Sequence, residues 1–359
     1  MAKSAKYLIV GSTEAYSGKS ATVIGLASQA QAAGLTIAYG KPINAMADDI
    51  NHSNDDVRFI QNTLALAPEQ VHPTLLSLTP DVIQQRISGQ DSQDYGAKLR
   101  QYQQCGSDLV LIEGPATLGQ GSLFDLSVEQ MATTLDAAIL LVFRYKTAAL
   151  IDDILAARKQ LGDRLCGVVI NNVPPEGIDQ VNDTLQPFLE DQGIPVYGVL
   201  PYSELLLSVS VKELVKQLDA EVLCRADRLN LMVGTLKIGA MNVNSALKYF
   251  RKAHHMAVVT GGDRTDLQLA AMETSTHCLI LTGHVAPTPE VLHRADDLEV
   301  PILAVDLDTL TAVEIIERAF GRVRLHEAVK VQCIRELVAS AFDMPRLLEQ
   351  LGAEAAAAV

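Results

Sequence analysis

Short apolar runs alternate with amphipathic segments of helix length along most of this chain. The runs span five to eight residues and are rich in Val, Ile and Leu. Continuous apolar runs separated by helices are typical of strands that are buried on both faces of a parallel sheet. The strands predicted in the first part of the chain are Tyr7–Gly11, Leu35–Gly40, Asp108–Glu113, Ala137–Phe143, Gly167–Asn171 and Val196–Leu200. The pattern predicts an α/β fold with a mostly parallel sheet flanked by helices.

The first two predicted strands are joined by a helix from about Lys19 to Ala33, with Gly34 at its end. Strand, helix and strand in this order form a crossover unit whose two strands pair in parallel. The segment Asn51–Gln104 is more polar, and we expect it to be mostly helical between its prolines.

A second alternating series follows a mixed, helix-rich stretch, Ser203–Ala253. Its predicted strands are Met256–Thr260, Cys278–Thr282 and Ile302–Val305, and its predicted helices are Asp266–Glu273, Thr288–Asp296 and Leu310–Phe320. Repeats of this kind build a compact α/β domain of their own. We therefore expect a first domain over 1–205, a second, smaller α/β domain over 206–330, and a C-terminal helical tail over 331–359 with a frayed Ala-rich end.

Composition narrows the class of protein. The chain has 359 residues, of which 48% are hydrophobic and 20% charged, so it folds into about two domains. Its net charge of −14, without a cluster of Lys and Arg, argues against a nucleic-acid partner. No apolar run approaches the roughly 18–20 residues that a membrane span needs, so we expect no membrane partner and a cytoplasmic protein. The five cysteines show no CxxC spacing, which argues against a zinc or redox pair.

The strongest local signal is the stretch Gly11–Ser20, which follows the first predicted strand and opens the first predicted helix. In that setting, backbone N–H groups and the helix N-terminus can cradle phosphates. Lys19 would then contact phosphate oxygens, and the Ser20 hydroxyl would bind Mg²⁺. Six residues separate Gly11 from Gly18, where the usual phosphate loop has four. A plain strand-to-helix turn is the alternative reading.

Further polar residues follow other predicted strands: Lys41, Glu113, the pair Asn171–Asn172, and Pro201. The carboxyl ends of the strands are where open α/β sheets bind ligands. Each of these residues also has a structural reading. Lys41 could lie on the surface, Glu113 could cap a helix, and the asparagines could simply form a turn. Asp55 and Asp56 open a predicted helix, so they could be caps as well.

These residues together resemble the dethiobiotin synthetase-like P-loop family, a relative of the cobyrinic acid a,c-diamide synthase group. The resemblance rests on Gly11–Ser20, Gly40-Lys41-Pro42, Asp55-Asp56, Glu113-Gly114, Asn171–Pro174 and Gly198–Pro201, and covers roughly residues 6–205. The best likeness is to the N-terminal half of long bacterial phosphotransacetylases. In the second domain, the segments Val258–Asp266 and Cys278–Gly283 resemble the DRTGG domain that those proteins carry in the same order.

The resemblance implies ATP and Mg²⁺ as cofactors. It implies catalytic roles for Lys19 and Lys41, and metal binding by Ser20, Glu113 and Asp56 or its neighbour Asp55. The residues expected to contact the nucleotide are Gly11, Ser12, Thr13, Glu14, Ser17, Gly18, Lys19, Ser20, Ala21, Asn171, Asn172 and Pro201.

Three departures from the family pattern matter. The loop has Tyr16-Ser17 where dethiobiotin synthetases have one residue. Pro115–Gly119 replaces the Gly-rich turn that binds their diamino acid substrate. The second domain reads Asp263–Asp266, without the two glycines of the DRTGG name. The turn Gly261–Thr265 could still cradle an anionic small-molecule effector, or could be a tight turn capped by Asp263.

Two functions remain open. The first is a regulatory or scaffold protein of metabolism, in which the P-loop domain binds ATP·Mg²⁺ and the DRTGG-like domain senses a metabolite or mediates homo-oligomer assembly. The second is an ATP-dependent ligase that activates a carboxylate or carbamate by γ-phosphate transfer. Phosphotransacetylase activity would need a further catalytic domain beyond these residues. We favour the regulatory function, because the nucleotide-binding parts are present and the substrate-specific parts are altered.

Overall fold

A computed structural model describes residues 6–44, 53–104, 106–283, 285–321, 325 and 327–353. The chain forms two compact units: Met1–Tyr202 with His326–Val359, and Ser203–Leu325. The Ala-rich end at 354–359 and the side chain of Asp55 lie outside the described residues.

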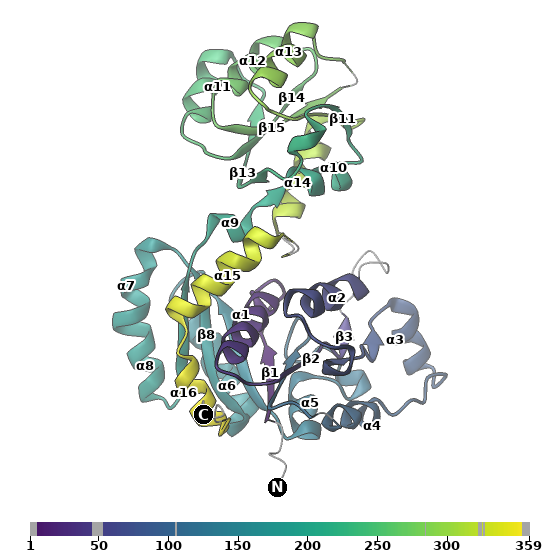
Figure 1. The fold of residues 1–359 in the computed structure, drawn as a ribbon, viewed down its shortest axis with the longest axis vertical. Coiled ribbons are helices and arrows are strands. Elements are labelled where there is room, and N and C mark those ends of the chain that lie inside the picture. The colour runs from purple at the N-terminus through teal and green to yellow at the C-terminus, as the bar shows by residue number, and fades with distance from the viewer. Residues whose placement is uncertain are drawn as a thin grey trace. The chain divides into compact units, whose positions relative to one another are not determined.

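The first unit is built on a parallel sheet in the order β4-β2-β6-β1-β7-β8-β9, seven strands within the described residues (Figure 1). The strands are β1 (Lys6–Gly11), β2 (Ile37–Gly40), β4 (Val71–His72), β6 (Leu109–Glu113), β7 (Ala138–Arg144), β8 (Leu165–Val173) and β9 (Val196–Pro201). The predicted parallel sheet is confirmed. The central strand β1 pairs with β6 on one side and β7 on the other.

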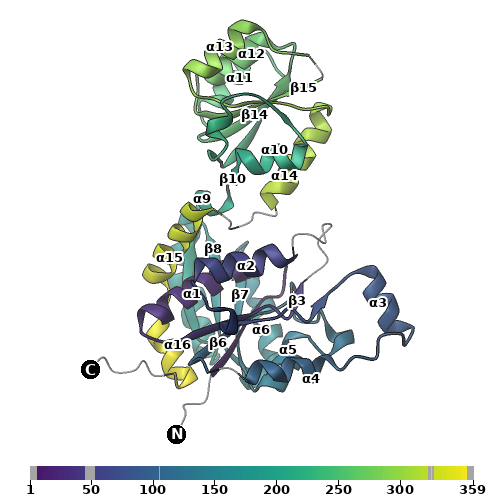
Figure 2. The same cartoon turned by 45° about the vertical axis from the view of Figure 1, so that its right-hand side comes forward.

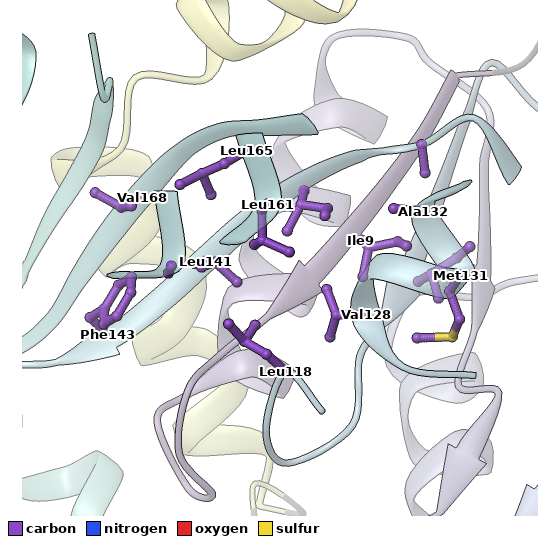
Figure 3. Close-up of a cluster of buried hydrophobic side chains, with 14 of the residues drawn as sticks. Ile9, Leu118, Val128, Met131, Ala132, Leu141, Phe143, Leu161, Leu165 and Val168 are labelled. Atoms are coloured by element: carbon purple, nitrogen blue, oxygen red, sulfur yellow. The ribbon is translucent and has the colours of Figure 1, made fainter. Parts of the chain in front are cut away.

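Helices cover both faces of this sheet. The main hydrophobic cluster joins alternate residues of β1, β7 and β8 to helices on one face, and Figure 3 shows Ile9, Val128, Leu141, Phe143 and Leu161 within it. The helices of that cluster are α4 (Tyr95–Arg100), α5 (Val128–Leu135), α6 (Leu150–Leu161), α7 (Ile178–Gln180) and α8 (Gln186–Asp191). Helix α1 (Lys19–Ala32) packs on the same sheet and contacts β1, β2 and β6.

The segment predicted to be a C-terminal tail is an integral part of the first unit. Helix α15 (Ala328–Ala341) packs along α1, and α16 (Met344–Leu351) contacts β9 (Figures 1 and 2). The Gln29 amide donates to the carbonyl oxygen of Val338 over 2.8 Å, and Arg335 Nε donates to Ser28 Oγ over 3.2 Å. An Arg346 guanidinium bonds both oxygens of Glu190 at 2.8 and 2.7 Å. These contacts join the last described helices to α1, to α8 and to the edge strand β9.

The segment predicted to be mostly helical also contains strands. It holds α2 (Ser53–Thr63), α3 (Pro80–Ile87) and α4, but also the edge strand β4 and the short strand β5 (Leu76–Ser77). Strand β5 pairs in parallel with β3 (Ile43–Asn44), which begins two residues after Lys41. Two-residue strands are too short to show a periodic pattern, which is why the sequence did not reveal them.

The second unit is a separate five-stranded sheet within the described residues, in the order β11-β16-β15-β14-β13. Its strands are β11 (Glu221–Cys224), β13 (Thr235–Gly239), β14 (Met256–Gly261), β15 (Thr276–Thr282) and β16 (Ile302–Ala304). Strand β11 pairs antiparallel with β16, and the other pairs are parallel. The stretch Ser203–Ala253, predicted to be mixed and helix-rich, does contain helices, and between them lie the strands β11, β13, β10 (Val209–Ser210) and β12 (Met232–Val233).

Two hydrophobic clusters fill the two faces of this second sheet. One holds residues of α11 (Val243–Phe250), α12 (Thr265–Met272) and α13 (Pro289–Asp297), and the other holds residues of α10 (Val211–Leu218) and α14 (Thr309–Gly321). Across the described residues of both units, none of the helices has the length and apolar character that crossing a bilayer requires.

Candidate functional site

The loop between β1 and α1 has the backbone of a tight, inward-facing turn. Gly18 precedes α1 with φ +104°, and a Cβ there would lie 2.2 Å from Asn171 Nδ2, so this position requires glycine. Tyr16, in the inserted part of the loop, has φ +57° and is exposed. The extra residues therefore bulge outward at Tyr16, while Gly18 keeps the close approach to the sheet.

Lys19 lies inside this loop rather than in solvent. Its Nζ donates to Ser12 Oγ over 2.7 Å, and the residue is only 8% exposed. Burial lowers the pKa of the Lys19 ammonium to about 8; the charge of Lys41 lowers it further, while Glu113 and Glu14 oppose the shift. Ser17 Oγ is buried and has no hydrogen-bond partner among the described residues. An oxygen of a bound ligand would accept hydrogen bonds from both groups, because the Lys19 ammonium and the Ser17 hydroxyl are donors.

Glu113, at the end of β6, is the most connected side chain of the site. Its Oε1 accepts a hydrogen bond from Ser20 Oγ over 2.9 Å, and its Oε2 accepts one from Tyr39 OH over 3.1 Å. The Lys41 ammonium lies 3.3 Å from Oε1. Glu113 is 4% exposed, so this carboxylate is a buried charge held by three donors rather than a helix cap at the surface.

Lys41 lies between two carboxylates. Its Nζ is 3.3 Å from Asp56 Oδ2 and 3.3 Å from Glu113 Oε1, and its side chain is 15% exposed. Burial alone would lower its pKa, but the attraction of Glu113 and Asp56 outweighs burial, so the pKa of Lys41 is raised. Lys41 is therefore a charged and mostly buried group of the site, and not a surface lysine.

The asparagine pair lies at the other side of the loop. Asn171 Nδ2 donates to the carbonyl oxygen of Ser17 over 2.8 Å, so this amide helps to fix the loop. Asn172 has φ +62°, and Pro201 is exposed and paired with Val173 on the neighbouring strand. The amide and the loop meet directly, whereas Asn172 and Pro201 line the adjoining strand ends.

The outer part of the loop borders a cavity of about 280 Å³. Thr13 and Glu14 line it, together with Arg144 and Lys146 from the end of β7. Glu14 forms an ion pair with Lys146. Of the other expected loop residues, Gly11 ends β1 and Ala21 lies in the first turn of α1.

Sequence reasoning missed Tyr39 and Lys146. Tyr39 looked like one more apolar residue of a buried strand, but its position carried a signal. It pairs with Leu111, and Glu113 lies two residues further along the same strand. Side chains two residues apart share one face of a sheet, so Tyr39 and Glu113 point to the same side.

The site has the donors that a hard divalent cation prefers, but too few to hold it alone. Ser20, Glu113 and Asp56 offer oxygen atoms. In the described part of the chain, no three His, Cys, Asp or Glu side chains gather as a metal cluster. A cation here would complete its shell with oxygens of a bound phosphate, which is the usual pattern for Mg²⁺.

In the second unit, the turn Gly261–Thr265 connects β14 to α12. A Cβ at Gly262 would lie 1.9 Å from the Val285 carbonyl oxygen, so a neighbouring loop packs directly on this glycine. The residue before α12 is Arg264, without a side-chain cap, so the reading of Asp263 as the N-cap was wrong. Arg264 bonds Asp266 at 3.2 Å and the Met241 carbonyl oxygen at 3.0 Å.

Comparison with known families identifies two domains in the chain, one after the other. The model of the AAA domain AAA_26 matches residues 6–210, and that of the DRTGG domain matches residues 213–319.

Curated relatives match different shares of the chain. The chain is 27% identical over 310 residues to phosphate acetyltransferase of Synechocystis sp., covering 81% of this chain and 44% of the relative. It is 27% identical over 227 residues to cobyric acid synthase of Rhizobium etli, covering 55% of this chain and 46% of that protein. The chain thus spans about half the length of the curated relatives it matches.

Among solved structures, the chain is similar to the CBS and DRTGG domains of the regulatory region of Clostridium perfringens pyrophosphatase, complexed with the activator diadenosine tetraphosphate. The identity is 21% and the TM-score 0.28, over 37% of this chain and 67% of that chain. From the family match and the relatives, the chain belongs to the AAA domain family AAA_26, with a dethiobiotin synthetase-like P-loop domain followed by a DRTGG domain, as in the N-terminal part of phosphate acetyltransferases.

Proposed function

We propose that this protein is a nucleotide-dependent regulatory protein of metabolism, whose P-loop domain binds ATP with Mg²⁺. The observation that carries the proposal is the buried Glu113 carboxylate, which joins Ser20, Lys41 and Tyr39 beside the phosphate loop. Lys19 and the loop amides would bind the phosphates, and Ser20, Glu113 and Asp56 would hold Mg²⁺. Bound Mg²⁺ would neutralise phosphate charge.

The DRTGG domain is proposed to sense a small-molecule effector at Gly261–Thr265 and to support a homo-oligomer. The Gln268 amide donates to the carbonyl oxygens of Gly261 and Gly262 at 2.9 and 3.0 Å, while its Oε1 is buried and has no partner in the described part of the chain. An effector hydroxyl or amino group would satisfy that oxygen. Identification of a small molecule that copurifies with the full chain tests this part of the proposal.

ATP binding above pH 8 is expected to take up protons. Because burial lowers the pKa of Lys19 to about 8, part of the free protein then carries a neutral amine. Phosphate oxygens favour the ammonium form, so binding raises this pKa and captures a proton, and the affinity falls as the pH rises through 8. Calorimetry at a pH of roughly 8.5 in two buffers of different ionisation enthalpy measures the uptake.

The matched control is Lys19→Arg, whose guanidinium stays charged throughout this range. It is expected to bind with less proton uptake than the wild type. Equal uptake by both proteins would show that the proton goes elsewhere, and that Lys19 is already charged in the free site.

A second candidate function is an ATP-dependent ligase, and the position of Lys41 favours it. Lys41 lies between Asp56 and Glu113, and Glu113 contacts Ser20 at the phosphate loop. In this position its ammonium would contact a phosphoryl group that is being transferred. In this function Lys19, Lys41 and Mg²⁺ would neutralise charge that develops on the γ-phosphate.

ATP turnover with candidate carboxylates, with and without Lys41→Ala, separates the two functions. The regulatory function predicts that ATP binds without carboxylate-stimulated release of ADP. The ligase function predicts stimulated release that falls about 100-fold or more in Lys41→Ala, as is typical when one electrostatic contact to the transition state is removed. Lys159→Ala, at an exposed position on α6, is the control and should match the wild type.

A further inference from the structure

Among the described residues, Tyr39 is the one polar contact of Glu113 that comes from neither the phosphate loop nor a charged group. It lies on β2, next to β6 in the sheet, and is completely buried. Its hydroxyl donates to Glu113 Oε2 over 3.1 Å. Phenylalanine at this position would keep the aromatic ring but would leave Glu113 Oε2 without this donor.

The two oxygens of Glu113 therefore have different surroundings. Oε2 faces the buried Tyr39 hydroxyl on the same face of the sheet, whereas Oε1 faces Ser20 and Lys41. A carboxylate with one oxygen fixed in this way cannot rotate freely, and it presents the other oxygen to the P-loop. Ser20, whose hydroxyl lies 2.9 Å from Oε1, is another of the oxygen ligands expected at the cation.

The Tyr39 hydroxyl acts as a hydrogen-bond donor to Glu113. A tyrosine hydroxyl ordinarily titrates near a pKa of about 10, so at neutral pH it carries its proton. Tyr39 thus stays protonated and donates its hydrogen bond to the carboxylate. Loss of a residue that hydrogen-bonds a metal-binding side chain from behind typically costs about 10- to 100-fold in metal affinity or activity.

We propose that Tyr39 is a positioning residue that fixes Glu113 so that Oε1 is presented to Mg²⁺. This inference rests on the proposed nucleotide function and adds a residue to it. Tyr39 does not contact the nucleotide; it acts through Glu113, and its effect appears only when the cation is bound.

The experiment compares binding of a non-hydrolysable ATP analogue to the full chain by calorimetry, in EDTA and across a Mg²⁺ titration. Tyr39→Phe is expected to match the wild type in EDTA. The Mg²⁺ concentration that gives half of the gain in affinity should rise about 10- to 100-fold. Tyr197→Phe is the control, because Tyr197 is another buried tyrosine, hydrogen-bonded to Gln350 and distant in the sheet from β2. It should match the wild type in both titrations.

A double-mutant cycle with Glu113→Gln separates positioning from packing. If Tyr39 acts through Glu113, adding Tyr39→Phe to Glu113→Gln should leave the Mg²⁺ dependence unchanged. Additive effects in this cycle, or a wild-type Mg²⁺ dependence of Tyr39→Phe alone, would overturn the inference while leaving the nucleotide function intact. A wild-type protein that binds no analogue in either buffer would overturn the proposed function and this inference with it.

Discussion

Lys19→Met is expected to bind ATP·Mg²⁺ about 100-fold more weakly than the wild type, or not measurably. A charge-assisted hydrogen bond contributes roughly 1.5–3 kcal/mol, and Lys19 is the buried cation of the phosphate loop. Methionine keeps the apolar stem of the side chain and removes only the ammonium. Calorimetric titration of the full chain with ATP and Mg²⁺ measures the loss.

The same variant carries its own control for misfolding. Because burial lowers the pKa of Lys19, the folded state binds this proton less tightly than the unfolded chain. The charged amine therefore costs stability below pH 8, and this cost decreases as the pH rises towards the unfolded value of 10.5. Lys19→Met should melt at a higher temperature than the wild type at neutral pH. A stable variant with wild-type affinity for ATP would show that the loop does not bind phosphates.

The sheet of the first unit was accessible from sequence because its strands are buried on both faces. Continuous runs such as Leu109–Glu113 leave little choice of element or of neighbour. The same burial makes a functional hydroxyl hard to recognise, because a tyrosine does not interrupt the apolar pattern of a buried strand. Tyr39 became visible only through the register with Leu111, which depends on non-local pairing.

The candidate site was predictable in part for a different reason. Lys41 follows β2 directly and Glu113 is the last residue of β6, and parallel strands bring their carboxyl ends to one edge. The direct contact of Asn171 with the Ser17 carbonyl and the ion pair of Glu14 with Lys146 depend on the path of the inserted loop. No spacing rule in the sequence determines that path.

The role of the last helices could not be predicted, since an amphipathic helix does not reveal which surface it covers. α15 packs on α1, whose first turn carries Lys19 and Ser20. Gly25 lies in the middle of α1, where glycine costs about 1 kcal/mol relative to alanine. Its place is explained by Val338 of α15: a Cβ at Gly25 would lie 2.4 Å from Val338 Cγ2 and 2.7 Å from its Cβ.

Gly25→Ala is therefore expected to lower the stability of the first unit despite the better helix propensity of alanine. Overpacking at a stiff, β-branched neighbour that is 2% exposed costs typically about 1–3 kcal/mol, which exceeds or cancels the gain of about 1 kcal/mol from propensity. Thermal unfolding should show a lower melting temperature of this unit, by about 2–4 °C for each kcal/mol lost.

Gly96→Ala on α4 is the matched substitution, because its added Cβ would meet nothing closer than 3.4 Å. It should leave the melting temperature unchanged or raise it. In the Gly25→Ala background, Val338→Ala should restore part of the lost stability, whereas alone it should destabilise by opening a cavity. Simple addition of the two losses would mean that α15 does not press on α1 at this point. Recovery in the double variant would establish that Gly25 exists to let the last helices lie against the helix that bears Lys19 and Ser20.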